Sequence, residues 1–179
     1  SYYSGTKLVQ ASPTLKPETV KSWEGGGEQK VITATHSKAT YYENILKDRT
    51  YSTDVNSTLN EKRNAGKAEI KGFEIEIKQA ITDNISTFAN YTYNKTKMLE
   101  NDSRPTSVGK QLTYTPKRQY NIGLIGKNTL WNGSIIGSYV DSLYTKEDNS
   151  DTIKNVYGAY ESYFVLNATL GYKIMEYLK

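Results

Sequence analysis

Cysteine is absent from this 179-residue chain, so it has no disulfide, no thiolate metal site and no cysteine nucleophile. Histidine occurs once, as His36, which leaves no pair of imidazoles for a His/Cys metal site. There is no Gly-x-Ser-x-Gly nucleophile motif, and the glycines at 25–27 do not lead into a helix as a phosphate-binding loop does. These absences predict a protein that is not an enzyme, with no cofactor and no metal site.

Long apolar runs and blocks of one charge are also missing. Only 36% of the residues are apolar, and no run approaches the ~20 residues of a membrane helix. A membrane β-barrel remains compatible with this composition, because only alternate residues of its strands must be apolar. The 23 basic and 19 acidic side chains are dispersed, without the basic block that follows nucleic-acid phosphates, so no nucleic-acid partner is expected. The 16 tyrosines suit strands that lie half in water.

What the sequence does contain is a strict alternation of apolar and polar residues. In "KAEIKGFEIEIKQAITDNISTFANYTYNKTK", residues 67–97, two alternating segments flank a turn rich in Asp and Asn, as in an antiparallel hairpin. The two later segments "RQYNIGLIG" and "SYFVLNATLGYKI" alternate in the same way. The apolar positions on one face are Phe73, Ile75, Ile77, Ile122, Leu124, Phe164, Leu166 and Leu170. The opposite face of the hairpin carries Glu74, Glu76, Lys78, Asn90, Thr92 and Asn94.

Short turns alternate with long polar connections along the chain. This arrangement predicts an all-β, antiparallel up-and-down meander of about seven strands. The segments at 19–30 and 37–47 are weaker strand candidates, the first because of its three glycines. In "NGSIIGSYVDSLY" both alternating sets of residues contain an Ile, so the sequence does not decide which set lies on the apolar face. The apolar face fits either lipid contact or the core of a soluble sandwich, and the polar face fits either a barrel lumen or bulk water.

Five segments, from about Ala11 to Ile174, follow one another in the order "SPTLKPETVKSWEGG", "NAGKAEIKGFEIEI", "FANYTYNKTK", "GKQLTYTPKRQYNIGL" and "YFVLNATLGYKI". In this order they resemble the TonB-dependent outer-membrane receptors, the siderophore and cobalamin receptor family. The resemblance implies that residues 1–179 form a later part of a barrel of about 22 strands, without the plug domain or the terminal strands. The chain departs from the family pattern at Arg49-Thr50 and at Gly25 to Gly27.

The resemblance also implies a function and a location. The chain would be barrel wall of a receptor in the bacterial outer membrane that takes up a ferric siderophore, a similar metal chelate or cobalamin, driven by TonB. TonB would act only through an N-terminal region outside these residues. The apolar face would then contact outer-membrane lipid and the polar face the lumen. The alternative is a stand-alone soluble or surface β-domain with a binding or structural role.

Two long connections supply ligand-binding candidates, because loops on a rigid barrel carry recognition. The candidates are Arg104, Lys110, Tyr144, Lys146, Tyr157 and Tyr160. Cationic and aromatic side chains suit an anionic, ring-bearing metal chelate, although charged outer loops are also ordinary in such receptors. The acidic stretch "EDNSD", Glu147 to Asp151, lacks the glycine and distal glutamate of an EF-hand and is interpreted as a solvated loop tip.

Overall fold

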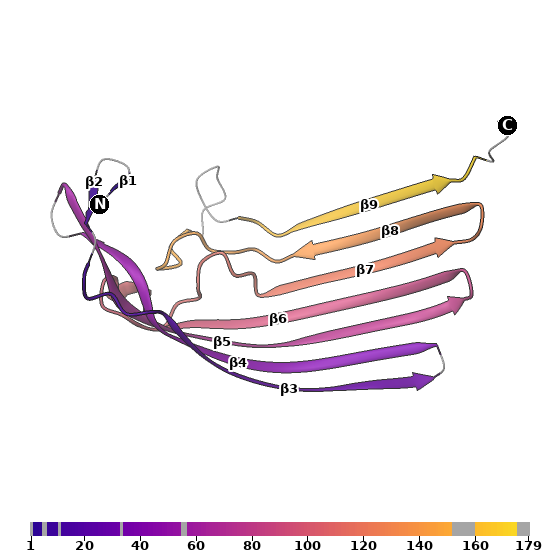
Figure 1. Cartoon of the computed structure of the whole chain (residues 1–179), viewed down its shortest axis with the longest axis horizontal. Coiled ribbons are helices and arrows are strands. Elements are labelled where there is room, and N and C mark those ends of the chain that lie inside the picture. The colour runs from indigo at the N-terminus through magenta and orange to yellow at the C-terminus, as the bar shows by residue number, and fades with distance from the viewer. Residues whose placement is uncertain are drawn as a thin grey trace.

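The computed structural model describes residues 2–4, 7–10, 12–32, 34–54, 57–151 and 160–174, which form one sheet (Figure 1). Its long strands are β3 (Thr19–Ile32), β4 (Thr35–Asp54), β5 (Leu59–Thr82), β6 (Ile85–Asn101), β7 (Arg118–Lys127), β8 (Trp131–Val140) and β9 (Tyr163–Tyr172). Two short strands, β1 (Tyr2–Ser4) and β2 (Lys7–Gln10), form a small hairpin near the N-terminus.

Each long strand pairs antiparallel with its neighbour in sequence, from β3 to β9. The turns after β3, β5 and β7 are short and lie at one end of the strands, called the short-turn edge below. The connections after β4, β6 and β8 lie at the opposite end of the strands, called the long-loop edge below (Figure 1). The predicted antiparallel meander is therefore confirmed. The exception is β2, which pairs in parallel with the start of β5.

Helical structure is minimal in the described residues. The 3-10 helix η1 (Pro105–Ser107) has three residues, and none of the described helices could cross a membrane.

Four strands are longer than ten residues, and β3 with 14 residues is the shortest of them. β4 has 20 residues, β5 has 24 and β6 has 17, and β4 and β5 run on beyond their neighbours at the long-loop edge (Figure 1). In these extensions charged residues such as Lys62 and Arg63 replace the apolar alternation. Backbone pairing alone continues the ladder there, because either face can be polar in water.

The two departures from the family pattern do not interrupt the sheet. β3 passes through its three glycines, where the Trp23 ring lies over Gly25 and the Ala39 carbonyl lies 2.7 Å from the place of a Cβ on Gly26. Close approach therefore explains Gly26. At Arg49 the β4–β5 register shifts beside Asp48, whose φ is 56°, and β4 then continues.

Little of the sheet is covered. The buried hydrophobic side chains among the described residues are Ala68, Met98 and Leu112, where the β6–β7 connection folds back over the sheet. The eight side chains predicted for the apolar face are all exposed, by 38% to 82%. A soluble sandwich would bury such a face against a second sheet, and the described residues form a single layer.

Candidate functional site

One face of the sheet, called the apolar face below, carries continuous rows of apolar and aromatic side chains. Hydrogen-bonded register places these residues side by side. One row from β4 to β9 is Ala39, Ile75, Tyr91, Tyr120, Tyr139 and Phe164, and the next is Ser37, Ile77, Ala89, Ile122, Gly137 and Leu166. Aromatic rings stack across strands, Phe73 on Tyr93 at 5.4 Å between centroids and Tyr120 on Tyr139 at 4.7 Å.

The register also fixes the facing of β8. Ile135 lies opposite Leu124 and Ala168 on the apolar face and is 53% exposed. Ile136 lies opposite Gly123 on the other face. The two isoleucines therefore point to opposite sides of the sheet.

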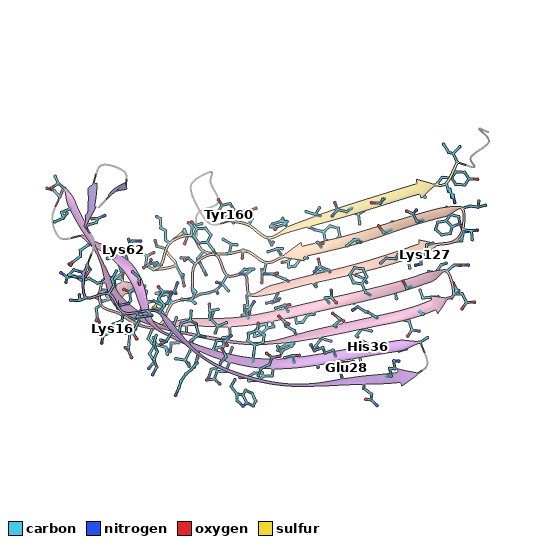
Figure 2. All side chains as sticks on the ribbon, viewed as in Figure 1. Lys16, Glu28, His36, Lys62, Lys127 and Tyr160 are labelled. Carbon is cyan, nitrogen blue, oxygen red and sulfur yellow. The ribbon has the colours of Figure 1, made fainter. Side chains whose placement is uncertain are left out.

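The other face, called the polar face below, brings all six predicted hairpin residues together with charged residues of β3 and β4. One row in register consists of Glu28, Lys38, Glu76, Asn90, Asn121 and Ser138. The Lys78 ammonium lies 2.7 Å from the Glu76 carboxylate, and His36 Nε2 lies 3.5 Å from Glu28 (Figure 2). The Tyr42 hydroxyl and the Asn94 amide oxygen form a hydrogen bond. The face thus carries charges of both signs, with Lys78 paired to Glu76.

The polar face also carries apolar residues, two of which, Ile125 and Val165, sequence reasoning overlooked. The Phe88 ring lies over Gly123, where it occupies the place of a Cβ, and Ile125 and Val165 are 39% and 41% exposed. A hollow of about 380 Å³ lies beside Phe88 and Ile125 and is lined on its other side by Lys30, His36 and Lys78. The adjacent apolar residues in "SIIG" and in "LIG" were the sequence signal that both faces of β7 and β8 are partly apolar.

The β6–β7 connection (102–117) and residues 141–151 of the β8–β9 connection interlock at the long-loop edge. Gln111 and Asn149 bond reciprocally: the Gln111 amide donates to the Asn149 side chain at 2.8 Å, and that side chain donates back at 3.0 Å. The Tyr114 amide donates to the Tyr144 carbonyl at 2.9 Å. Arg104 Nη1 lies 3.3 Å from Glu147. Two segments far apart in sequence therefore form one surface.

Asp151 anchors the second of these connections and corrects the interpretation of "EDNSD" as a solvated tip. Asp151 is only 3% exposed, and its Oδ2 accepts from the Thr145 amide at 2.5 Å, the Thr145 hydroxyl at 2.8 Å and the Lys146 amide at 3.3 Å. Burial raises the pKa of this carboxyl, but the bonds from Thr145 and Lys146 outweigh it, and the pKa lies below its ordinary value.

Asp148, near the tip of the same connection, forms its own turn. The Ser150 amide donates to Asp148 Oδ1 at 3.0 Å, and hydrogen bonds from Ser150 lower the pKa of Asp148. No cluster of acidic and histidine side chains suited to a metal ion occurs in the part of the chain that the structure describes.

The structure places five of the six predicted loop residues at this edge. Lys110 and Lys146 are exposed, and the Tyr160 side chain is 61% exposed at the loop end of β9 (Figure 2). Arg104 is paired with Glu147, so its charge is partly neutralised. Tyr144 is half-buried where the two connections meet. Tyr157 lies outside the described residues.

Two of the quoted segments meet at a single side chain. Asn64, in "NAGKAEI", accepts from the Lys16 amide at 2.6 Å and donates to the carbonyls of Lys16 at 2.9 Å and Asp48 at 2.6 Å. Glu18, in "LKPET", accepts from the Thr50 amide at 2.6 Å. The segment before β3 is therefore fixed to the bulge of β4.

The comparisons with known proteins agree on one family. Residues 1–179 match the family described as TonB dependent receptor-like, beta-barrel. An uncharacterized TonB-dependent receptor of Haemophilus influenzae is 46% identical over 76 residues, which cover 39% of this chain and 22% of that protein.

Solved structures of such receptors share the fold. The unliganded ferric citrate transporter FecA is similar with a TM-score of 0.71 and 19% identity, over 90% of this chain and 24% of that chain. The ferric yersiniabactin uptake receptor FyuA from Yersinia pestis is similar with a TM-score of 0.70 and 20% identity, over 89% of this chain and 23% of that chain. The 179 residues thus span about a quarter of the length of these relatives.

Proposed function

Because the chain belongs to the TonB-dependent receptor-like β-barrel family, we propose that it forms barrel wall of a receptor that imports a ferric siderophore or a similar metal chelate across the bacterial outer membrane. The family is one of outer-membrane receptors and not of enzymes. In this proposal TonB supplies the driving force through a part of the receptor outside residues 1–179.

The observation that carries the proposal is the exposed apolar face. Its rows continue across β5 to β9, and no second layer of described residues covers them. A face of this kind is stable in contact with lipid and unstable in water. Strands β7, β8 and β9 each have 10 residues, the number that a tilted strand needs to cross a bilayer.

The polar face is proposed to line the lumen. Glu74, Glu76, Lys78, Asn90, Thr92 and Asn94 are supported in this role by their position opposite the lipid-facing rows. Paired charges such as Lys78 with Glu76 stay hydrated or bond a plug domain in a water-filled barrel. The eight residues predicted for the apolar face, all of them exposed, are proposed to contact lipid.

The interlocked connections are proposed to contribute to ligand capture from outside. Lys110 and Lys146 offer exposed charge, Tyr160 offers an exposed ring, and Arg104, Tyr144 and Tyr157 belong to the same segments. FecA and FyuA are described as a ferric citrate transporter and a ferric yersiniabactin uptake receptor. A ferric siderophore or similar anionic chelate suits these side chains by charge and by ring contact.

The test follows the native polypeptide with an antibody against residues 67–97. We expect a band several times heavier than 20.2 kDa, because related receptors are about four times as long. It should fractionate with the outer membrane and increase when iron is limiting. A soluble band of this chain's own mass would instead identify a stand-alone β-domain.

A further inference from the structure

The apolar face has a hollow near the short-turn edge, between β6 and β9. In the register, one row across these strands consists of Ile85, Gly126, Gly133 and Leu170. The two glycines lie directly opposite each other and carry no side chain, so a gap opens between the isoleucine and the leucine. The gap has a volume of about 430 Å³, and its walls include Leu124, Trp131, Ile135 and Ala168. It is called the glycine hollow below.

Side chains at the two glycines cannot fill this hollow. The Trp131 ring lies 2.7 Å from the place of a Cβ on Gly126, and the Thr169 carbonyl lies 3.1 Å from the place of a Cβ on Gly133. The walls stay open, since Leu124 and Ile135 are 46% and 53% exposed. Apolar atoms that line an unfilled space lack dispersion contacts on that side, and a flexible apolar chain would supply them.

Aromatic rings and positive charge mark one end of the glycine hollow. Trp131 lies opposite Tyr172 in the register, where β8 begins and β9 ends. Tryptophan and tyrosine concentrate at the membrane–water interface, so this pair marks the level of lipid head groups. Lys127 is exposed at the same short-turn edge (Figure 2), and the exposed Lys173 directly follows Tyr172. Neither lysine forms an ion pair with another described residue.

We propose that the glycine hollow binds an acyl chain of one anionic phospholipid, whose phosphate lies at the level of Lys127 and Lys173. The hollow is continuous with the rows proposed to contact lipid, because Leu124 follows Ile122 on the same face of β7. The positive charge at its end complements a phosphate. The site rests on the proposed function, because the short-turn edge reaches the inner leaflet only in an outer-membrane barrel.

Two exposed alanines of the apolar face provide a matched pair of variants. Ala168 lines the glycine hollow, whereas Ala39 lies on β4 in the row of Ile75, away from it. Leucine at either position adds the same apolar group to the same face. Only Ala168→Leu places that group in the hollow, so any general effect of a larger side chain should be equal in the two variants.

The experiment uses the complete receptor, extracted from outer membranes in mild detergent, stripped of lipid and titrated with phosphatidylglycerol. Native mass spectrometry should show a single phospholipid retained by the unaltered receptor and by Ala39→Leu. Ala168→Leu should bind it about tenfold more weakly, the cost of forcing extra carbon atoms into a filled site.

A second measurement needs no variant that fills the hollow. Phosphatidylglycerol with brominated acyl chains quenches the fluorescence of an indole that it contacts. The emission of Trp131 is the difference between the unaltered receptor and Trp131→Phe. It should be quenched completely once a single brominated lipid is bound, well before a full lipid layer surrounds the barrel.

Three results would overturn the site. They are equal lipid retention by Ala168→Leu and the unaltered receptor, equal loss in Ala39→Leu, and quenching of Trp131 that rises only with a full lipid layer. A lipid-free pair of receptors that Ala168→Leu separates would identify the hollow as a contact between two copies instead. The proposed function would survive all of these results, because each is measured on a receptor taken from the outer membrane. A polypeptide that never reaches that membrane would overturn the proposed function itself.

Discussion

Asn64 shows why a short sequence motif requires one particular side chain at one position. Its amide group bonds the backbone of Lys16 in both directions and the carbonyl of Asp48, whose φ of 56° marks the bulge in β4. Only a side chain with both a donor and an acceptor at this position can satisfy these groups. Asp would lose both donated bonds, and a hydroxyl is too short to reach both segments.

Asp151 is the residue whose ionisation should control the loop edge. Its pKa is lowered in the folded chain, so the ionised carboxylate stabilises the fold above the ordinary carboxyl value near ~4. That stabilisation is lost as the pH falls through the lowered pKa. We therefore expect the amides of Thr145 and Lys146 to be protected from hydrogen exchange at neutral pH and to lose protection in acid.

The substitution Asp151→Asn tests this expectation. Asparagine keeps one acceptor without charge, so protection of Thr145 should be weaker at neutral pH and nearly independent of pH. Asp102→Asn changes an exposed carboxylate in the neighbouring connection and serves as the control. An acid transition at Thr145 that persists unchanged in Asp151→Asn would show that another group is responsible.

At the scale of the element, successive residues of each strand point alternately to the apolar face and to the polar face of the sheet. Ile122 is 57% exposed on the apolar face of β7, and its neighbour Asn121 lies on the polar face in the row of Asn90 and Ser138. If the apolar face contacts lipid, Ile122→Lys should destabilise the folded receptor in a bilayer by about 2–4 kcal/mol. Asn121→Lys should cost much less, because it stays in water.

The measurement is the denaturant midpoint of the complete receptor in lipid bilayers, with both lysine variants compared to the unaltered protein. The pair is matched in charge, in strand and in position along it. Similar losses for Ile122→Lys and Asn121→Lys would contradict lipid contact by the apolar face. Destabilisation by Asn121→Lys alone would reverse the assignment of the two faces.

Alternation predicted the faces of β5, β6, β7 and β9 because most of the apolar residues in each strand fall on one parity. It could not orient β8, where Ile135 and Ile136 are adjacent and only pairing with β7 decides. It could not predict that the Phe88 ring packs over Gly123, because only the pairing of β6 with β7 brings these two residues together. The Gln111–Asn149 contact joins residues 38 apart, so no local pattern reports it.

At the scale of the whole molecule, the sheet has two unpaired sides. In the residues that the structure describes, β3 pairs only with β4 and β9 only with β8. Open edges readily pair with other strands, and a barrel removes them by closure. The apolar face and the open edges thus support the same arrangement. In a membrane barrel, lipid covers the apolar face and further strands pair with the open edges.

If the complete receptor takes up a ligand as proposed, uptake should depend on which end of this sheet carries the binding charge. Tyr160 lies at the long-loop edge and Lys127 at the short-turn edge (Figure 2). Lys110 and Lys146 are exposed on the interlocked connections, whereas Lys127 ends β7. If those connections capture an anionic chelate, Lys110→Ala with Lys146→Ala should raise the KM of ferric siderophore uptake by about tenfold, the loss of one charged hydrogen bond.

Lys127→Ala should leave that KM unchanged, because its charge lies at the opposite edge. Uptake of radioactive iron by cells with equal receptor levels in the outer membrane measures both variants and keeps folding defects apart from binding defects. A lower maximal rate at constant KM would indicate a role in transport rather than in capture. Equal KM values for all three proteins would remove the two lysines from the binding surface, while the lipid-facing assignment, which rests on the exposed rows of β5 to β9, would stand.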